Sequence, residues 1–202
     1  RREIAPRRYA AEPAQTAARI ETVEAEVPAT VLTVAYHMPG QHSPMFIPAD
    51  LLTDILASGR SARLFTQILN RSELFTDVDA SILGSDEPGL LMVSGRLRDN
   101  SQTTIDEARG LIDSTLSQLV ERPVDDEELQ RAKNRSISSF TLPMVDLEKR
   151  VSAIATREIA GLDFNRVVAD YSAVTPEQVW EAARTILTAD NSNTLIYGPA
   201  QG

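Results

Sequence analysis

The pattern of hydrophobic and polar positions divides the chain into segments of two kinds. In one kind apolar residues alternate with polar ones, and in the other they recur at helical spacing. Alternating or β-branched stretches predict five strands, because successive strand residues point to opposite faces of a sheet. These strands cover residues 17–26, 30–37, 74–83, 90–97 and 193–199. Pro28 predicts a short turn between the first two strands. The tract GSDEPG at 84–89 predicts a hairpin loop between the third and the fourth.

Apolar residues at helical spacing fill the intervals between these strands. The predicted helices cover 47–56, 61–69, 101–121, the stretch from Asp125 to a break at Pro143, the stretch from Val151 to Gly161, and a last helix that opens at Thr175. Ser61 is a candidate N-cap for the second helix. Asp125 with Glu128 resembles a capping box, and Thr175 with Gln178 is a strong helix start.

The resulting order, β-β-α-α-β-β-α-α-α-α-β, contains more hairpins than β-α-β units. It predicts an α+β fold with a mainly antiparallel sheet and helices packed on one face. Residues 1–16 hold Pro6 and Pro13, and we interpret them as a linker from a preceding domain. Residues 17–202 then form one domain. The chain opens without methionine or a signal-peptide stretch, so we expect a piece excised from a longer protein.

Composition removes several classes of function. The 202 residues include no cysteine and two histidines, which excludes disulfides, thiolate zinc sites, iron–sulfur ligation and thiol nucleophiles. The net charge is −9, and it is uneven: residues 1–8 carry +3 and the other 194 carry −12. An acidic chain is a poor ligand for nucleic acid. No apolar run approaches the roughly 18 residues of a membrane span, so we expect no membrane insertion.

The candidate metal ligands are few and badly spaced. His37 and His42 straddle the end of a strand and a Pro-Gly loop, which favours surface histidines over a metal pair. The acidic run 125–128 suggests a cation site, but a charged helix start explains it as well. The remaining acidic candidates lack the ladder of an EF-hand loop. They are Asp77, Asp79, Asp86 and Glu87.

Phosphate and nucleophile motifs are no stronger. The glycines form neither a P-loop nor a dinucleotide fingerprint, and no G-x-S-x-G elbow occurs. Residues 58–61 (Ser-Gly-Arg-Ser) precede a predicted helix, where an arginine and backbone N–H groups could hold an anion. A turn between two helices is the simpler interpretation. The residues alone therefore indicate an α+β domain and no catalytic constellation.

The sequences GRSARLFTQILNRSELFTDVDASI at 59–82 and EPGLLMVSGRL at 87–97 carry a family resemblance. They resemble the second, non-zinc domain of the pitrilysin/insulinase-type metallopeptidases, a family that includes mitochondrial processing peptidase and the core subunits of the respiratory cytochrome bc complex. The positions that match the family pattern are Gly59, Ser61, Arg63, Leu64, Leu74, Val78 and Ala80. Later helices and the closing strand fit in order, so the resemblance spans about residues 20–200.

The resemblance also identifies what this chain lacks. The family's peptidase domain carries H-x-x-E-H, with two zinc ligands and a general base, and no such motif occurs here. The partner half of these enzymes usually offers an arginine and, seven residues later, a tyrosine that stabilises the oxyanion. Those two positions align with Leu69 and Thr76. We therefore predict no catalytic, cofactor-binding or metal-binding residue in this chain.

The implied function is that of a non-catalytic accessory domain of a pitrilysin-like zinc metalloprotease, which forms part of a substrate chamber. The expected partners are a preceding zinc-peptidase domain of the same polypeptide, a second related half or subunit, and a peptide substrate. Zinc is expected in the preceding domain only. The alternative is a scaffold relative without peptidase activity. If the source is bacterial, a cysteine-free chain favours the periplasm or cell envelope.

Overall fold

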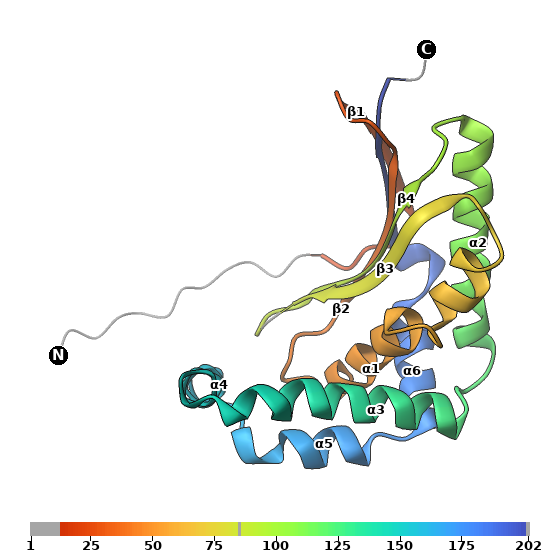
Figure 1. Cartoon of the computed structure of the whole chain (residues 1–202). Coiled ribbons are helices and arrows are strands. Elements are labelled where there is room, and N and C mark those ends of the chain that lie inside the picture. The colour runs from red at the N-terminus through yellow and green to blue at the C-terminus, as the bar shows by residue number, and fades with distance from the viewer. Residues whose placement is uncertain (1–12, 85, 201–202) are drawn as a thin grey trace, which may run out of the picture.

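The computed structural model describes residues 13–84 and 86–200, and it centres on one five-stranded sheet (Figure 1). The strands are β1 (Arg19–Glu24), β2 (Val31–Met38), β3 (Phe75–Leu83), β4 (Gly89–Leu97) and β5 (Ser192–Gly198). Their order in the sheet is β1-β5-β2-β4-β3. Only β1 and β5 pair in parallel, and the other three pairs are antiparallel. The five predicted strands and the mainly antiparallel sheet are confirmed.

The first two strands are joined by a short segment but are not neighbours. Strand β5 lies between them, and the backbone N–H of Ala25 donates to the carbonyl oxygen of Gly198 at 2.9 Å. Burial explains the order: alternate residues of β2 are buried, whereas all six residues of β1 are exposed. The apolar strand therefore takes the centre of the sheet, and β1 forms an edge.

Residues 1–12 of the predicted linker lie outside the described residues. Its last part is attached to the sheet, because the Gln15 side chain donates to the Ser192 carbonyl at 3.0 Å and accepts from Asn193 at 2.9 Å. Contacts with the sheet therefore include Gln15, a few residues before β1.

Helices cover one face of the sheet, as predicted. They are α1 (Phe46–Ala57), α2 (Gln102–Glu121), α3 (Asp126–Thr141), α4 (Leu147–Ile159), α5 (Val167–Ala173) and α6 (Pro176–Ile186). Helix α1 contacts β3, helix α2 contacts β4, and helix α6 contacts β2. Helix α3 packs outside α1, and α5 lies beside α3 (Figure 1). Within the described ranges, no helix is long and apolar enough to cross a membrane.

The second predicted helix differs from its expectation. Residues Leu64–Leu69 form a π-helix, and the Asn70 N–H donates to the Phe65 carbonyl at 2.9 Å, five residues back. No side chain caps this turn, so the prediction of Ser61 as its N-cap is wrong. The turn begins only at Leu64, which is fully buried together with Ile68, and core packing sets its start and width.

The remaining helix boundaries follow local signals. Helix α3 ends before Pro143, which lies in a 3-10 turn, η2 (Leu142–Val145), and Asp146 caps α4 by accepting from the Lys149 N–H at 3.1 Å. The capping box of α6 at Thr175 is formed on both sides. Helix α5 was not predicted, because its seven residues bury only Val167 and show no repeat long enough to detect.

Candidate functional site

The segment with the family resemblance begins at the turn between α1 and the π-helix. Gly59 has a φ of +92°, a left-handed conformation that favours glycine. The hydroxyl of Ser58 donates to the Asp54 carboxylate at 2.5 Å, and Ser136 from α3 donates to its other oxygen. The carboxylate of Asp54 therefore connects α1, the turn and α3. Residues 58–61 make a helix-joining turn, which is the simpler of the two interpretations.

A nearly buried ion pair lies next to this turn. Arg63 donates from Nε and Nη2 to the two carboxylate oxygens of Glu128 at 3.0 and 2.8 Å. The side chains are 9% and 17% exposed. Such a bidentate pair holds both groups in one geometry and joins the start of the π-helix to the first turn of α3. Nη1 of Arg63 is buried without a partner in the described part of the chain.

This ion pair corrects one sequence interpretation. Asp125 does cap α3, since its carboxylate accepts from the Glu128 N–H at 2.6 Å. The expected return bond from the Glu128 side chain is not made, because that carboxylate binds Arg63 instead. The acidic run 125–128 is therefore half of a capping box plus one tertiary ion pair.

A second buried carboxylate connects α1 to α5. The Tyr171 hydroxyl donates to Asp50 at 2.5 Å. Burial raises the pKa of Asp50 above its ordinary value, while the hydrogen bond from Tyr171 opposes that rise. Burial and the neighbouring carboxylate of Asp50 likewise raise the pKa of Tyr171. The sequence offered no signal for this pair, because its members are 121 residues apart.

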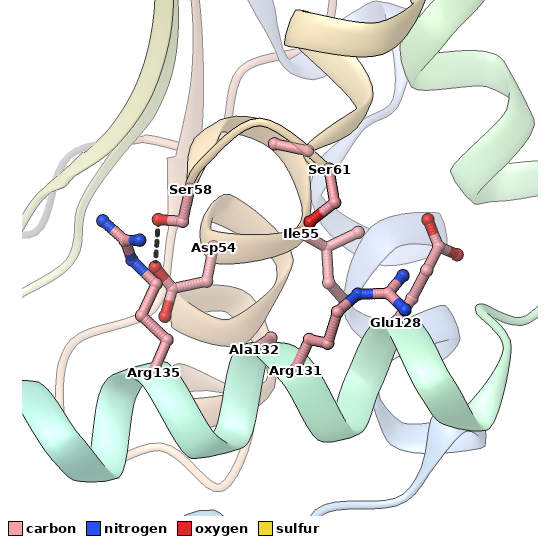
Figure 2. Close-up of a pocket in the computed structure, with 9 residues that line it drawn as sticks. Asp54, Ile55, Ser58, Ser61, Glu128, Arg131, Ala132 and Arg135 are labelled. Atoms are coloured by element: carbon pink, nitrogen blue, oxygen red, sulfur yellow. Dashed lines mark hydrogen bonds between the residues drawn. The ribbon is translucent and has the colours of Figure 1, made fainter.

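A small cavity of about 40 Å³ opens between α1, the turn and α3 (Figure 2). Its lining includes Asp54, Ser58, Glu128, Arg131 and Arg135. This space suits a water molecule or little more, so it does not admit a peptide. The two carboxylates also disfavour a free anion beside the arginines. Figure 2 shows these polar side chains lying along a junction between helices rather than converging on one reaction centre.

The histidines do not meet. His37 lies at the end of β2, where its Nδ1 is 3.3 Å from Oδ1 of Asn191, and the Asn191 amide donates to the His37 carbonyl at 2.9 Å. His42 is exposed in the following loop. Across residues 13–84 and 86–200, no group of three His, Cys, Asp or Glu side chains is placed to hold a metal ion.

The other candidates lie on or next to β3. Asp77 and Asp79 are exposed on the strand, and Asp86 and Glu87 lie in the loop that follows it. Thr76, in the position of the family's tyrosine, lies at a bulge and donates to the Arg96 carbonyl at 3.2 Å. Leu69, in the position of the arginine, packs against the core.

The polar groups at the junction of α1, the turn at 58–61 and α3 are mainly paired with one another, which is typical of a structural element. The profile of the family described as the peptidase M16 inactive domain matches residues 3–136, about two thirds of the chain. The chain therefore belongs to the family of peptidase M16 inactive domains. No curated protein matches it.

Solved structures agree on the fold. A protease from Helicobacter pylori superimposes with a TM-score of 0.88 at 15% identity, over 98% of this chain and 48% of that one. A candidate zinc protease from Bordetella pertussis superimposes with a TM-score of 0.72 at 26% identity, over 85% of this chain and 94% of that one. The inactive peptidase domain of a candidate zinc protease from Bordetella parapertussis superimposes with a TM-score of 0.75 at 24% identity, over 89% of this chain and 98% of that one.

These comparisons confirm the predicted family and the role of a non-catalytic accessory domain. The chain spans about half the length of the Helicobacter protein but nearly the whole length of the two Bordetella structures.

Proposed function

We propose that this chain is the accessory half of a zinc metallopeptidase, in which it forms part of the substrate chamber and supports a zinc-bearing domain of the same polypeptide. The single observation that carries the proposal is the match to the inactive domain over residues 3–136. In this interpretation residues 17–202 are the accessory domain and residues 1–16 the connection to the preceding one. A second related half or subunit would complete the chamber.

The residues that the structure describes do not fit a zinc site. His37 is engaged with Asn191, His42 lies apart in a loop, and no third ligand is grouped with them in the part of the chain that the structure describes. Zinc is therefore assigned to another domain, and no catalytic step is assigned to this one. Its own polar residues hold α1, α3 and α5 together, which suits a rigid wall or support.

The decisive experiment examines the polypeptide encoded by the whole gene. We expect H-x-x-E-H within the roughly 200 residues before Arg1, zinc bound at one equivalent, and peptide hydrolysis that is lost when either histidine of that motif is replaced by alanine. The same substitution at His42 is the control and should leave both unchanged. A gene without the motif would instead indicate a scaffold relative and would refute the peptidase assignment.

The charge of the chain suggests which peptides such a chamber favours. Outside residues 1–8 the chain carries −12, and an acidic surface attracts basic peptides over distances of about a Debye length, roughly 8–10 Å at physiological salt. We expect the affinity of the intact enzyme for a basic peptide to fall as salt rises from 50 to about 500 mM, with a neutral peptide as control. An affinity that is independent of salt would refute the electrostatic part of the proposal.

A further inference from the structure

The only tryptophan of the chain lies on helix α6, next to the end of α2. Helices α2 and α6 pack side by side (Figure 1), and the indole N–H of Trp180 donates to the Val120 carbonyl at 2.8 Å. This bond satisfies the one polar group of the indole and holds the ring in place. The guanidinium carbon of Arg184 lies 4.8 Å from the ring centroid, so the ring already has a cation over it.

An open hollow of about 470 Å³ lies along α6 at this ring, and we call it the α6 hollow. Its lining residues are Glu177, Trp180, Glu181, Arg184 and Thr185. Trp180 is partly buried, and the other four are exposed. The two glutamates are four residues apart, as are Trp180 and Arg184, so all four share one side of the helix. The volume lies in the range of small-ligand sites, roughly 300–1,000 Å³, and is sufficient for one arginine side chain.

The charges of the α6 hollow are not matched within the domain. In the part of the chain that the structure describes, neither glutamate takes part in an ion pair or a side-chain hydrogen bond, and Arg184 contacts the ring rather than a carboxylate. The helix dipole accounts for Glu177 in the first turn, but not for Glu181. Like charges four residues apart destabilise a helix slightly. A cation bound between the two carboxylates would remove that repulsion.

The chemistry of the α6 hollow suits a guanidinium group. The electron-rich face of an indole attracts a cation, and carboxylates accept the N–H groups at the edge of a guanidinium plane. Arg184 demonstrates that the ring of Trp180 accepts this group. Because that contact is solvent-exposed it is weak, so a guanidinium that also reaches Glu177 and Glu181 can displace Arg184 from the ring.

We propose that the α6 hollow binds an arginine side chain of a basic polypeptide segment, which takes the place of Arg184 on the ring of Trp180. The chain carries a net charge of −9, which attracts such a segment and repels a second copy of the chain. The two carboxylates disfavour an anionic partner, nucleic acid included. The inference goes beyond the function proposed above and does not depend on it, since it uses residues of this chain alone.

The single tryptophan makes the test direct, because its fluorescence reports on Trp180 and on no other residue. The 202-residue chain is titrated with tri-arginine amide and, as the control peptide, with tri-citrulline amide, in which a neutral urea group replaces each guanidinium. We expect a saturable change in emission with the arginine peptide and an affinity at least about tenfold lower for the citrulline peptide. Equal responses to the two peptides would overturn the proposal.

Two double variants separate the α6 hollow from a general attraction to an acidic chain. Glu177→Gln with Glu181→Gln should weaken binding of the arginine peptide by about tenfold, and both positions are exposed, so the fold should persist. The matched control, Glu107→Gln with Glu158→Gln, removes two exposed carboxylates from α2 and α4 and should weaken binding by less than about twofold. Equal losses in the two variants would mean that the peptide binds no particular site, and the proposal would be refuted.

A third comparison tests whether the ligand replaces Arg184. We expect Arg184→Gln to tighten binding of the arginine peptide by about threefold, because no internal cation then competes for the ring. Arg60→Gln removes the same charge at an exposed position in the turn at 58–61 and should leave the affinity nearly unchanged. Equal effects of the two substitutions, or weaker binding by the Arg184 variant, would refute the exchange on the ring. Emission that changes with protein concentration in the absence of peptide would assign the α6 hollow to a second copy and refute the proposal as well.

Discussion

The cationic side chain of Arg63 is only 9% exposed, and Glu128 compensates its charge. The carboxylate of Glu128 accepts both hydrogen bonds from Arg63, and it is itself mostly buried. Removing one member of such a pair leaves the other charge without compensation in a poorly solvated place. The arginine of the family motif therefore has a structural role in this chain, which is to hold the π-helix against α3.

We expect Arg63→Met to lower the free energy of unfolding by about 3 kcal/mol, because Glu128 then remains buried and unpaired. Adding Glu128→Leu should restore most of the loss, since two apolar side chains replace the pair. Urea unfolding of the two single variants and the double variant measures the coupling. Additive losses in the double variant would show that the pair does not act as a unit.

The Asp50–Tyr171 pair predicts a pH effect. The folded-state pKa of Asp50 lies above its ordinary 3.8, so folding takes up a proton between those two values. The stability that this group contributes is fully present below the unfolded pKa and is lost as pH rises through the folded one. Asp50→Asn keeps an acceptor for Tyr171 but does not titrate.

We therefore expect the Asp50→Asn variant to gain stability relative to the unchanged chain as pH rises from about 4 to 7. Urea unfolding at several pH values measures the difference. Asp79→Asn, at an exposed carboxylate on β3, is the control for the loss of one negative charge. A difference that is independent of pH, or that falls as pH rises, would contradict the assignment.

At the scale of single elements, two glycines illustrate the difference between packing and propensity. A Cβ at Gly95 in β4 would lie 2.6 Å from the ring of Phe75, which is buried in β3. A Cβ at Gly110, inside α2, would meet nothing within 4 Å. The first position is set by the close approach of a neighbouring strand, and the second has no such neighbour.

We expect Gly95→Ala to destabilise the protein by about 1–3 kcal/mol through overpacking. Gly110→Ala should stabilise it by about 0.5–1 kcal/mol, since alanine loses less backbone entropy in a helix. Thermal unfolding of both variants checks the pair. Phe75→Leu should relieve much of the strain at position 95, and the absence of any such rescue would argue against the steric explanation.

Element boundaries were largely predictable because their signals are local. Thr175 and Gln178 form the complete capping box, and Pro143 lies where α3 stops. The same logic failed at Ser61, where core packing rather than a cap decides where the helix starts. Helix α5 was missed because its seven residues bury only Val167 and show no helical repeat, and because its bond from Tyr171 to Asp50 is tertiary.

At the scale of the whole molecule, the chain belongs to the family of peptidase M16 inactive domains, and its chemistry should be that of a support. We expect the 202-residue chain by itself to bind no stoichiometric zinc and to cleave no peptide. Isothermal titration with zinc and a fluorogenic peptide assay measure both. A 1:1 zinc complex that is abolished by His37→Ala or His42→Ala would contradict this expectation.

The sequence by itself determined the five strands, most of the helices and the family pattern at 59–97. It also determined the absence of cysteine and the separation of the two histidines. Those features depend on composition and on periods of two or 3.6 residues, which are read within a short window. The tertiary structure decided the insertion of β5 between β1 and β2 and the choice of Glu128 as partner of Arg63, 65 residues away. It also decided that Leu147 and Val151 of α4 are exposed. An amphipathic pattern states that a helix has an apolar side, but only the packing of distant segments decides whether that side is buried in its own domain.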